Sequence, residues 1–277
     1  TEGYPSINRV IDFSEKEQSV IKIELKVEEL SEVVLSAKRR EVFLLRRMED
    51  FQQTEIYAGK KNEVILIEQS MGNLASNNSR QIFNQIPGLN IYQNDDAGLQ
   101  LNIGGRGLDP NRTSNFNTRQ NGYDISADVL GYPESYYTPP AEGLEEIQIM
   151  RGAASLQYGT QFGGLINFKL KGPDPIKPFT FITRNTLGSN NLLTNFSMAS
   201  GTLDKFKYIG FVNLKKGDGF RLNSNFNSTN IFFQIGYDFS EDTFVTAEVT
   251  YLDYLTQQAG GLSDIMFDEN PCQSNRS

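Results

Sequence analysis

Apolar and polar residues alternate with a period of two through the second half of the chain. Odd positions from 229 to 239 are apolar or aromatic apart from one threonine, and the even positions include Asn230, Gln234 and Asp238. This period predicts strands that present one apolar face. We expect five such strands, at residues 178–186, 190–201, 205–215, 228–239 and 242–255.

The lengths and connections of these strands favour a membrane barrel over a soluble sandwich. The apolar face would be core in a sandwich and would meet lipid in a barrel. The longer strands reach the roughly 9 to 11 residues that a tilted strand needs to cross a bilayer. Short turns near 188–190, 203–204 and 240–242 contrast with a long Asn-rich connection at 216–228. Short turns on one side and long loops on the other are typical of outer-membrane barrels.

The central part of the chain predicts a domain of mixed α and β structure. Strands are expected at residues 62–68, 89–92 and 99–103, with a helix over 70–86 that Pro87 and Gly88 end. Residues 142–171 predict a strand, a short helical segment and a second strand. Glycines stand at each join, namely at 152, 159, 163 and 164, where the backbone needs positive φ.

The N-terminal part predicts a hairpin and a linker. Two β-rich runs, at residues 7–13 and 20–27, flank a polar stretch. Residues 30–37 are Val- and Leu-rich, and from the pattern alone one more strand is the favoured interpretation. The charged, poorly patterned residues 38–53 follow and can act as a tether.

Composition removes several classes of function. The chain of 277 residues has 26 Lys and Arg against 34 Asp and Glu, and this charge of -8 argues against nucleic acid as a partner. It has no His, which is the commonest residue in zinc sites and acid–base catalysis, and its one cysteine, Cys272, has no partner for an internal disulfide. The sequence contains no run of about 18 apolar residues, so no transmembrane helix is predicted. A start at Thr1 without an apolar leader indicates a removed signal peptide or a fragment.

A glycine-rich stretch at residues 104–107 could be taken for a phosphate-binding loop. No Gly-Lys-Ser or Gly-Lys-Thr follows it, and no convincing helix opens after it. The alternative is a strand end where glycines let the backbone pass close to a neighbour. Arg106 then needs an acidic partner, because an unpaired buried guanidinium is costly.

Two motifs give the chain a family resemblance. Residues 149–159, Ile-Met-Arg-Gly-Ala-Ala-Ser-Leu-Gln-Tyr-Gly, with Gly-Gly-Leu-Ile-Asn-Phe at 163–168, and residues 102–108, Asn-Ile-Gly-Gly-Arg-Gly-Leu, resemble the plug-domain signatures of TonB-dependent outer-membrane receptors. Their order and spacing are similar to those of the family. Asn121-Gly122-Tyr123 departs from its usual Asp-Gly turn, although Asn-Gly is itself a strong turn dipeptide.

The resemblance implies an α+β plug domain inside a transmembrane antiparallel β-barrel, of which only the first strands are present. It implies the end of a small carboxypeptidase-regulatory-like β-sandwich at residues 1–30, a TonB box and linker at 31–54, the plug at 55–172 and about five barrel strands at 173–277. A plugged transporter of this kind needs about 22 strands. The chain would therefore stop early in the barrel.

The same resemblance implies a function. We expect a receptor in the bacterial outer membrane, in contact with its lipid, that binds a ferric chelate and imports it into the periplasm with a TonB-type periplasmic coupling protein. No catalytic activity, cofactor or metal site is expected. The plug is most similar to ferric-dicitrate-type siderophore receptors of Bacteroidetes-like architecture. A glycan-importing receptor of the same superfamily and a non-transporting surface adhesin are the alternatives.

Candidate site residues fall into three groups. The TonB box is expected at Glu32, Val33, Val34 and Leu35, an extended segment that pairs with the coupling protein as an added strand. By resemblance, Arg106 and Arg151 form a plug–barrel lock with glutamates of the wall, for which Glu248 is the one acidic candidate in the present strands, although most partners are expected in further strands. The ligand-binding candidates, chosen by loop position, are Asp95, Asp96, Asn111, Arg112 and Tyr132. Arg112 suits a carboxylate best, because its planar fork can donate two bonds.

Overall fold

The computed structural model describes residues 45–52, 55–57, 62–70, 72–127, 134–159, 161–240 and 242–276. Residues 40–277 form one compact unit. The hairpin expected within residues 1–30 and the TonB box at residues 32–35 lie outside the described residues, and both stay predictions. No helix in the part that the structure describes is long and apolar enough to cross a membrane.

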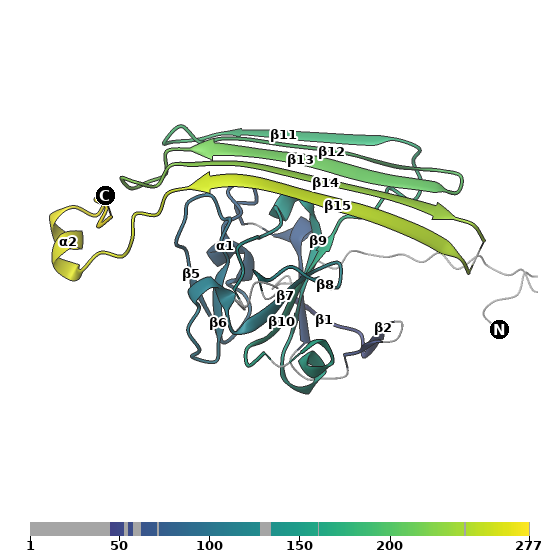
Figure 1. The fold of residues 1–277 in the computed structure, drawn as a ribbon, viewed down its shortest axis with the longest axis horizontal. Coiled ribbons are helices and arrows are strands. Elements are labelled where there is room, and N and C mark those ends of the chain that lie inside the picture. The colour runs from purple at the N-terminus through teal and green to yellow at the C-terminus, as the bar shows by residue number, and fades with distance from the viewer. Residues whose placement is uncertain are drawn as a thin grey trace, which may run out of the picture. The chain divides into compact units, whose positions relative to one another are not determined.

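Six strands make the sheet of the central domain, here called the plug sheet. Their order is β1-β4-β9-β10-β7-β8, and β10 pairs in parallel with β7 while the other neighbours are antiparallel (Figure 1). The bounds are β1 Leu45–Arg47, β4 Asn62–Leu66, β7 Phe116–Gln120, β8 Tyr123–Asp124, β9 Leu144–Met150 and β10 Gly164–Leu170. Because β1 pairs with β4, its residues belong to the plug sheet, although they lie within the range that the sequence assigns to a linker.

Smaller elements surround the plug sheet. Two short antiparallel pairs are β2 (Phe51–Gln52) with β3 (Glu55–Ile56), and β5 (Leu89–Tyr92) with β6 (Asn102–Gly105). The described helical segments of the central domain are α1 (Ser79–Phe83) and the 3₁₀ turns η1 (Ile67–Gln69), η2 (Asn111–Thr113), η4 (Ala141–Gly143) and η5 (Gly152–Tyr158).

The helix α1 is much shorter than the helix expected over residues 70–86. Asn77 has a left-handed backbone with φ 55°, and its side chain joins the Gly98 carbonyl and the Ala141 amide. The side chain of Asn78 then caps the helix by accepting from the Gln81 amide. A left-handed residue followed by an N-cap allows a helix to start only after Asn78.

The strand expected over residues 99–103 begins instead at Asn102. The carboxylate of Asp95 accepts hydrogen bonds from the backbone amides of Leu99 and Gln100, at 3.1 Å each. These amides serve a loop and do not enter the strand ladder. β6 therefore forms from Asn102 onward, where it pairs with β5.

The strand, helical turn and strand expected over residues 142–171 are confirmed as β9, η5 and β10. Gly152, Gly159 and Gly164 have φ values of 81°, 127° and 118°, which side chains rarely adopt, so glycine is needed at these joins. Gly163 lacks the expected positive φ, and glycine is needed there because a Cβ would lie 2.6 Å from the Asn115 carbonyl oxygen. Gly104 has a different role. A Cβ at this position would collide with the carbonyl oxygen of Leu108, which confirms the close backbone passage expected there.

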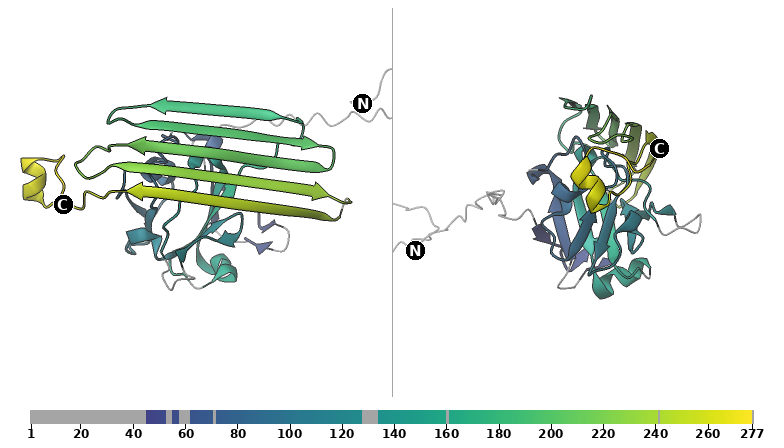
Figure 2. Two further views of the ribbon diagram at one scale, coloured as in Figure 1. Left: turned by 45° about the horizontal axis from the view of Figure 1, so that its top comes forward. Right: turned by 90° about the vertical axis from the view of Figure 1, so that its left-hand side faces the viewer.

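The second sheet, here called the wall sheet, confirms the five long strands to within three residues at each end. It contains β11 (Thr180–Leu187), β12 (Leu193–Leu203), β13 (Phe206–Gly217), β14 (Phe226–Asp238) and β15 (Phe244–Thr256), paired antiparallel in chain order (Figure 2). The short β12–β13 and β14–β15 turns lie at one end of the sheet. The longer β13–β14 connection and the helix α2 (Asp264–Glu269) lie at the other end (Figure 1). The turn near 188–190, which the sequence places with the short turns, lies at the end of the long connection, because β11 and β13 flank β12.

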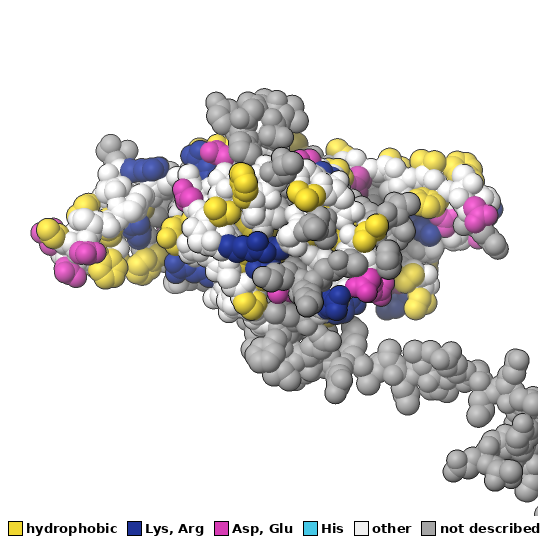
Figure 3. All heavy atoms as spheres, turned by 90° about the horizontal axis from the view of Figure 1, so that it is seen from below, with side chains coloured by type: hydrophobic (Ala, Val, Ile, Leu, Met, Phe, Trp, Pro, Cys, Tyr) yellow, Lys and Arg dark blue, Asp and Glu magenta, His cyan; other side chains and the backbone are white. Residues whose placement is uncertain are grey.

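Exposure alternates along the wall strands as the sequence predicts. In β14, the odd residues from Ile231 to Tyr237 are exposed, while Asn230 and Phe232 are buried against the plug. The outer face therefore exposes large apolar side chains on β11, β14 and β15: Phe181, Ile231, Phe233, Ile235, Tyr237, Val249 and Tyr251. The plug face opposite the wall sheet differs, since its apolar side chains are scattered among charged ones (Figure 3).

Aromatic residues on the inner face of the wall sheet form a seat for the plug. The ring of Phe211 is stacked on that of Phe232, with a centroid distance of 5.3 Å, and is tilted against that of Phe196, at 5.5 Å. They belong to the same buried cluster as Ala141, Leu144 and the plug strands. A Cβ on Gly143 would lie 2.9 Å from the Phe211 ring, so glycine is required for this close approach.

Replacing Gly143 by leucine is expected to destabilise the contact between plug and wall by about 1 to 3 kcal/mol, because the added carbons overpack against the Phe211 ring. The measurement is the temperature at which the plug of the full-length protein becomes accessible to protease. Combining Gly143→Leu with Phe211→Ala should restore part of the loss. Gly172→Leu is the control, since no atom lies within 4 Å of its Cβ position. Equal melting of the Gly143 and Gly172 variants would contradict the close approach.

Candidate functional site

The upper loops of the plug meet the wall sheet at the end that carries its long loops. The carboxylate of Asp96 accepts from the Phe220 amide at 2.8 Å, and the Gln258 side chain donates to that of Gln100 at 2.9 Å. The hydroxyl of Tyr254 donates to the carbonyl of Tyr136 at 3.3 Å. The plug surface at this end, here called the apex, therefore includes the candidates Asp95 and Asp96.

Two of the ligand-binding candidates at the apex are already engaged in the fold. Asp95 is only 5% exposed, and burial raises the pKa of its carboxyl although four backbone amides, those of Leu99 and Gln100 first, oppose the shift. Asp96 binds the Phe220 amide in the β13–β14 loop. Their carboxylates hold the apex loop in place and join it to the wall.

Arg112 forms a compact triad with two residues that sequence analysis did not single out. Its Nη1 donates to Glu134 Oε2 and to Tyr136 Oη, each at 2.9 Å, and its guanidinium lies 5.2 Å from the centre of the Tyr136 ring. The Tyr136 hydroxyl also donates to Glu134 Oε2. The Arg112 side chain remains 39% exposed. We call these residues the Arg112 triad.

The backbone at Arg112 is fixed by the neighbouring signature motif. Arg112 has a left-handed φ of 49°, and its amide donates to the side-chain oxygen of buried Asn102 at 2.9 Å. Asn102 is the first residue of β6. The triad is thus tied to the strand that leads into the Gly104–Gly107 stretch.

The remaining ligand candidates are less informative. Asn111 is exposed, and its amide donates to the Asp109 carboxylate at 3.0 Å. Tyr132 lies outside the described residues. A role of either residue in ligand binding stays a prediction.

The two arginines expected in a plug–barrel lock converge on one turn of the plug. Arg151 is bound to Glu63 of β4 at 2.5 Å and donates to the Pro87 carbonyl at 3.0 Å, with 6% of its side chain exposed. The Arg106 amide donates to the Gly88 carbonyl at 3.1 Å, and its exposed side chain forms no hydrogen bond or ion pair with another described residue. Arg151 therefore has its partner within the plug. A wall partner for Arg106 stays a prediction.

Glu248 faces the plug as expected, but its partner there is the side-chain amide of Asn121 and not an arginine. Its Oε2 accepts from Asn121 at 3.0 Å and from Gln234 at 3.2 Å. The β7–β8 turn that carries Asn121 and Gly122 has positive φ at both residues, which confirms the expected Asn-Gly turn. Burial first, and then Glu248, raise the pKa of the adjacent Tyr123 to about 12. The contact between plug and wall around Glu248 is therefore a network of polar side chains.

One ion pair joins the plug to the wall among the described residues, and its charges are the reverse of those expected. Glu142 of the plug lies 3.8 Å from Arg184 of β11. The Glu142 carboxylate is buried, and this burial raises its pKa. Glutamate on the plug and arginine on the wall are not a pattern that the motifs predict, because neither residue lies in a signature.

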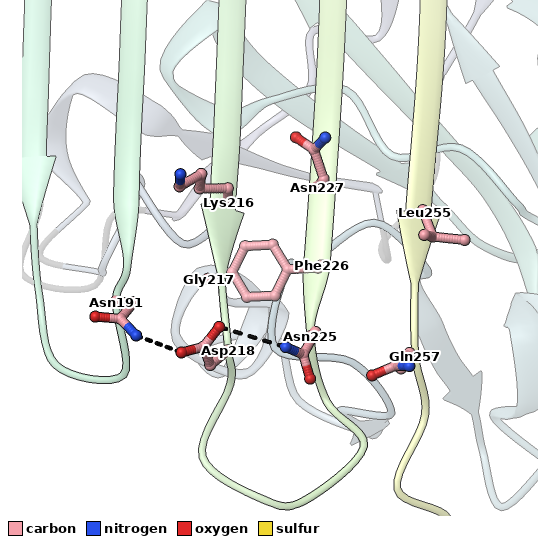
Figure 4. Close-up of a pocket in the computed structure, with 9 residues that line it drawn as sticks. All are labelled: Asn191, Lys216, Gly217, Asp218, Asn225, Phe226, Asn227, Leu255 and Gln257. Carbon is pink, nitrogen blue, oxygen red and sulfur yellow. Dashed lines mark hydrogen bonds between the residues drawn. The ribbon is translucent and has the colours of Figure 1, made fainter.

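A hollow of about 400 Å³ lies at the long-loop ends of β12 to β15 (Figure 4). Its polar edge is Asp218, which accepts from Asn191 and, at 3.3 Å, from Asn225. Lys216, Asn227 and Leu255 in its lining are exposed, whereas Gly217 and Phe226, which also line it, are buried. Phe226 packs with Ala97 and Leu99 of the apex loop, so the hollow borders the apex.

Comparisons with known proteins agree with this architecture. Residues 62–165 match the family described as TonB-dependent Receptor Plug Domain. The ferric enterobactin receptor PirA of Pseudomonas aeruginosa is 26% identical over 160 residues, which are 51% of this chain and 21% of that protein.

Solved structures show the same fold. The unliganded ferric citrate transporter FecA superposes with a TM-score of 0.64 at 22% identity, over 82% of this chain and 35% of that one. The siderophore receptor PirA from Acinetobacter baumannii superposes with a TM-score of 0.54 at 19% identity, over 72% of this chain and 32% of that one. The chain thus spans about a third of the length of these structures and about a fifth of the curated relative. These relatives are named as receptors and transporters, not as enzymes.

Proposed function

We propose, from the premise that residues 62–165 are a plug domain of the TonB-dependent receptor family, that this chain is part of an outer-membrane receptor that binds a ferric chelate and imports it into the periplasm. The relatives named above bind or transport ferric chelates, which supports iron as the cargo. The chain would supply the plug and the first wall strands of that receptor.

The two-sided wall sheet carries the proposal. Its inner face holds the plug through the aromatic seat and the Glu248 network. Its outer face exposes the large apolar side chains of β11, β14 and β15, which water would not favour and a bilayer would cover. A sheet with a filled inner face and an apolar outer face is what a plugged membrane barrel requires.

Energy coupling is proposed to act through the segment that precedes the plug sheet. Glu32 to Leu35 would pair as an added strand with a TonB-type periplasmic protein. The chain then enters β1 and β4, and β4 carries Glu63, the partner of Arg151. A pull on this segment would reach the ion pair that joins β4 to the signature motif.

The experiment is growth of cells that lack the full-length gene on ferric chelates as the sole iron source. Loss of growth on at least one chelate, restored by the gene, is expected. Growth that depends on the gene only when an oligosaccharide is the carbon source would replace iron by glycan as the cargo. A defect in surface attachment with normal uptake of both would instead support an adhesin.

A further inference from the structure

We propose that Glu134 makes the apex select its ligand by charge. By neutralising Arg112, it favours an uncharged or singly cationic ferric chelate, such as a ferric tris-hydroxamate, over a polyanionic one. This inference rests on the proposed function. It departs from the expectation, based on resemblance, of a ferric-dicitrate-type ligand.

The Arg112 triad carries no net positive charge. Arg112 Nη1 is shared by Glu134 and Tyr136, and the Tyr136 ring covers one face of the guanidinium. The hydrogen bonds from Tyr136 and Arg112 lower the pKa of Glu134, so its carboxylate is ionised at neutral pH. An anionic ligand at this guanidinium would either displace Glu134, and leave a partly buried carboxylate without its partner, or lie beside that carboxylate and be repelled by its charge.

The other basic side chains near the apex are also occupied. Arg221 donates from Nε and Nη2 to the Gln273 carbonyl, at 3.0 and 2.8 Å, and from Nη1 to the Gly260 carbonyl, at 2.6 Å. Arg276 donates to the Gln258 side chain at 3.2 Å. Lys215 is 4% exposed, donates to a carbonyl of the apex loop, and interacts electrostatically with Glu142 and Asp95. Arg112 is therefore the cation that a change in Glu134 would release.

The excess of acidic residues in the loops around the triad also disfavours binding of an anionic ligand. Three described plug segments form the apex around the triad, residues 93–101, 108–115 and 134–138, and they contain four Asp and Glu but one Arg and no Lys. A surface with an excess of one charge sign lowers the local concentration of ligands of the same sign. Direct neutralisation at Arg112 and the surrounding charge thus act in the same direction.

The test measures the binding of two probes to the purified full-length receptor. One probe is a ferric tris-hydroxamate of zero net charge, and the other is ferric dicitrate. The wild-type protein should bind the uncharged chelate at least about tenfold more tightly. Glu134→Gln keeps an acceptor for the Tyr136 hydroxyl and frees Arg112, so affinity for ferric dicitrate should rise by about tenfold, while affinity for the uncharged chelate changes less than about threefold.

The control is Asp109→Asn, which removes the same charge from an exposed position near the triad. It should change ferric dicitrate binding by less than about threefold, because it releases no arginine. Wild-type preference for ferric dicitrate, or equal effects of the two substitutions, would overturn the inference and leave the proposed function in place. Binding of neither probe, together with growth on every ferric chelate without the gene, would reject both.

Discussion

Replacing Val34 by proline is expected to abolish import of the ferric chelate while binding at the cell surface stays unchanged. Proline has no backbone N–H and fixes φ near -65°, so it interrupts the ladder through which an added strand pairs. The plug sheet begins at Leu45, so its fold should be unaffected. The measurement is uptake of labelled iron by cells that express the full-length protein.

Val34→Ala is the matched control, because it shortens the side chain but keeps the amide. It should retain most of the uptake, since backbone bonds carry strand addition. Normal uptake in the Val34→Pro variant would show that residues 32–35 are not the coupling segment. Loss of both uptake and binding would show instead that the segment supports the fold.

Replacing Arg151 by alanine is expected to lower the stability of the folded plug by about 3 to 5 kcal/mol, because Glu63 then loses its partner at a largely buried site. The Pro87 carbonyl also loses its donor. The measurements are the force needed to extract the plug from the full-length barrel and the leak of small solutes through it in liposomes. We expect a lower extraction force and a greater leak than in the wild-type protein.

Two further variants separate the ion pair from the proposed lock. Combining Arg151→Ala with Glu63→Ala should recover part of the extraction force, because no uncompensated charge remains. Arg106→Ala removes an exposed side chain that forms no bond among the described residues, so within the plug alone it should have little effect. A large loss for Arg106→Ala in the full barrel would place its partner in the remaining wall strands. No loss for Arg151→Ala would contradict a stabilising role of its buried ion pair with Glu63.

Short-range sequence patterns predicted most of the fold. The wall strands followed from the period of two, because each strand must present one face to the plug and the other outward. The β9–η5–β10 unit followed from glycines at joins that need positive φ. The prediction of a helix over residues 70–86 was wrong, because Asn77 has a left-handed backbone and its side chain is hydrogen-bonded to Gly98 and Ala141, which are distant in sequence.

The site was predicted only in outline, for the same reason. Loop position predicts a ligand site at Asp95, Asp96 and Arg112, and the role of these residues in binding stays a prediction, while the structure shows Asp96 bonded to the wall loop. The partners of the key side chains are set by tertiary contacts: Glu63 is 88 residues from Arg151, and Glu134 is 22 residues from Arg112. A charged residue two positions before an aromatic one, as in Glu134-Ser135-Tyr136, was the available signal for the triad.

Energy-dependent import is the central claim, and accumulation of labelled ferric chelate tests it most directly. Cells expressing the full-length protein are compared with and without a protonophore that collapses the inner-membrane proton gradient. We expect surface binding to be equal in both, while accumulation inside the cell falls to the level of cells without the gene. Accumulation that continues at the same rate in the presence of the protonophore would contradict the account.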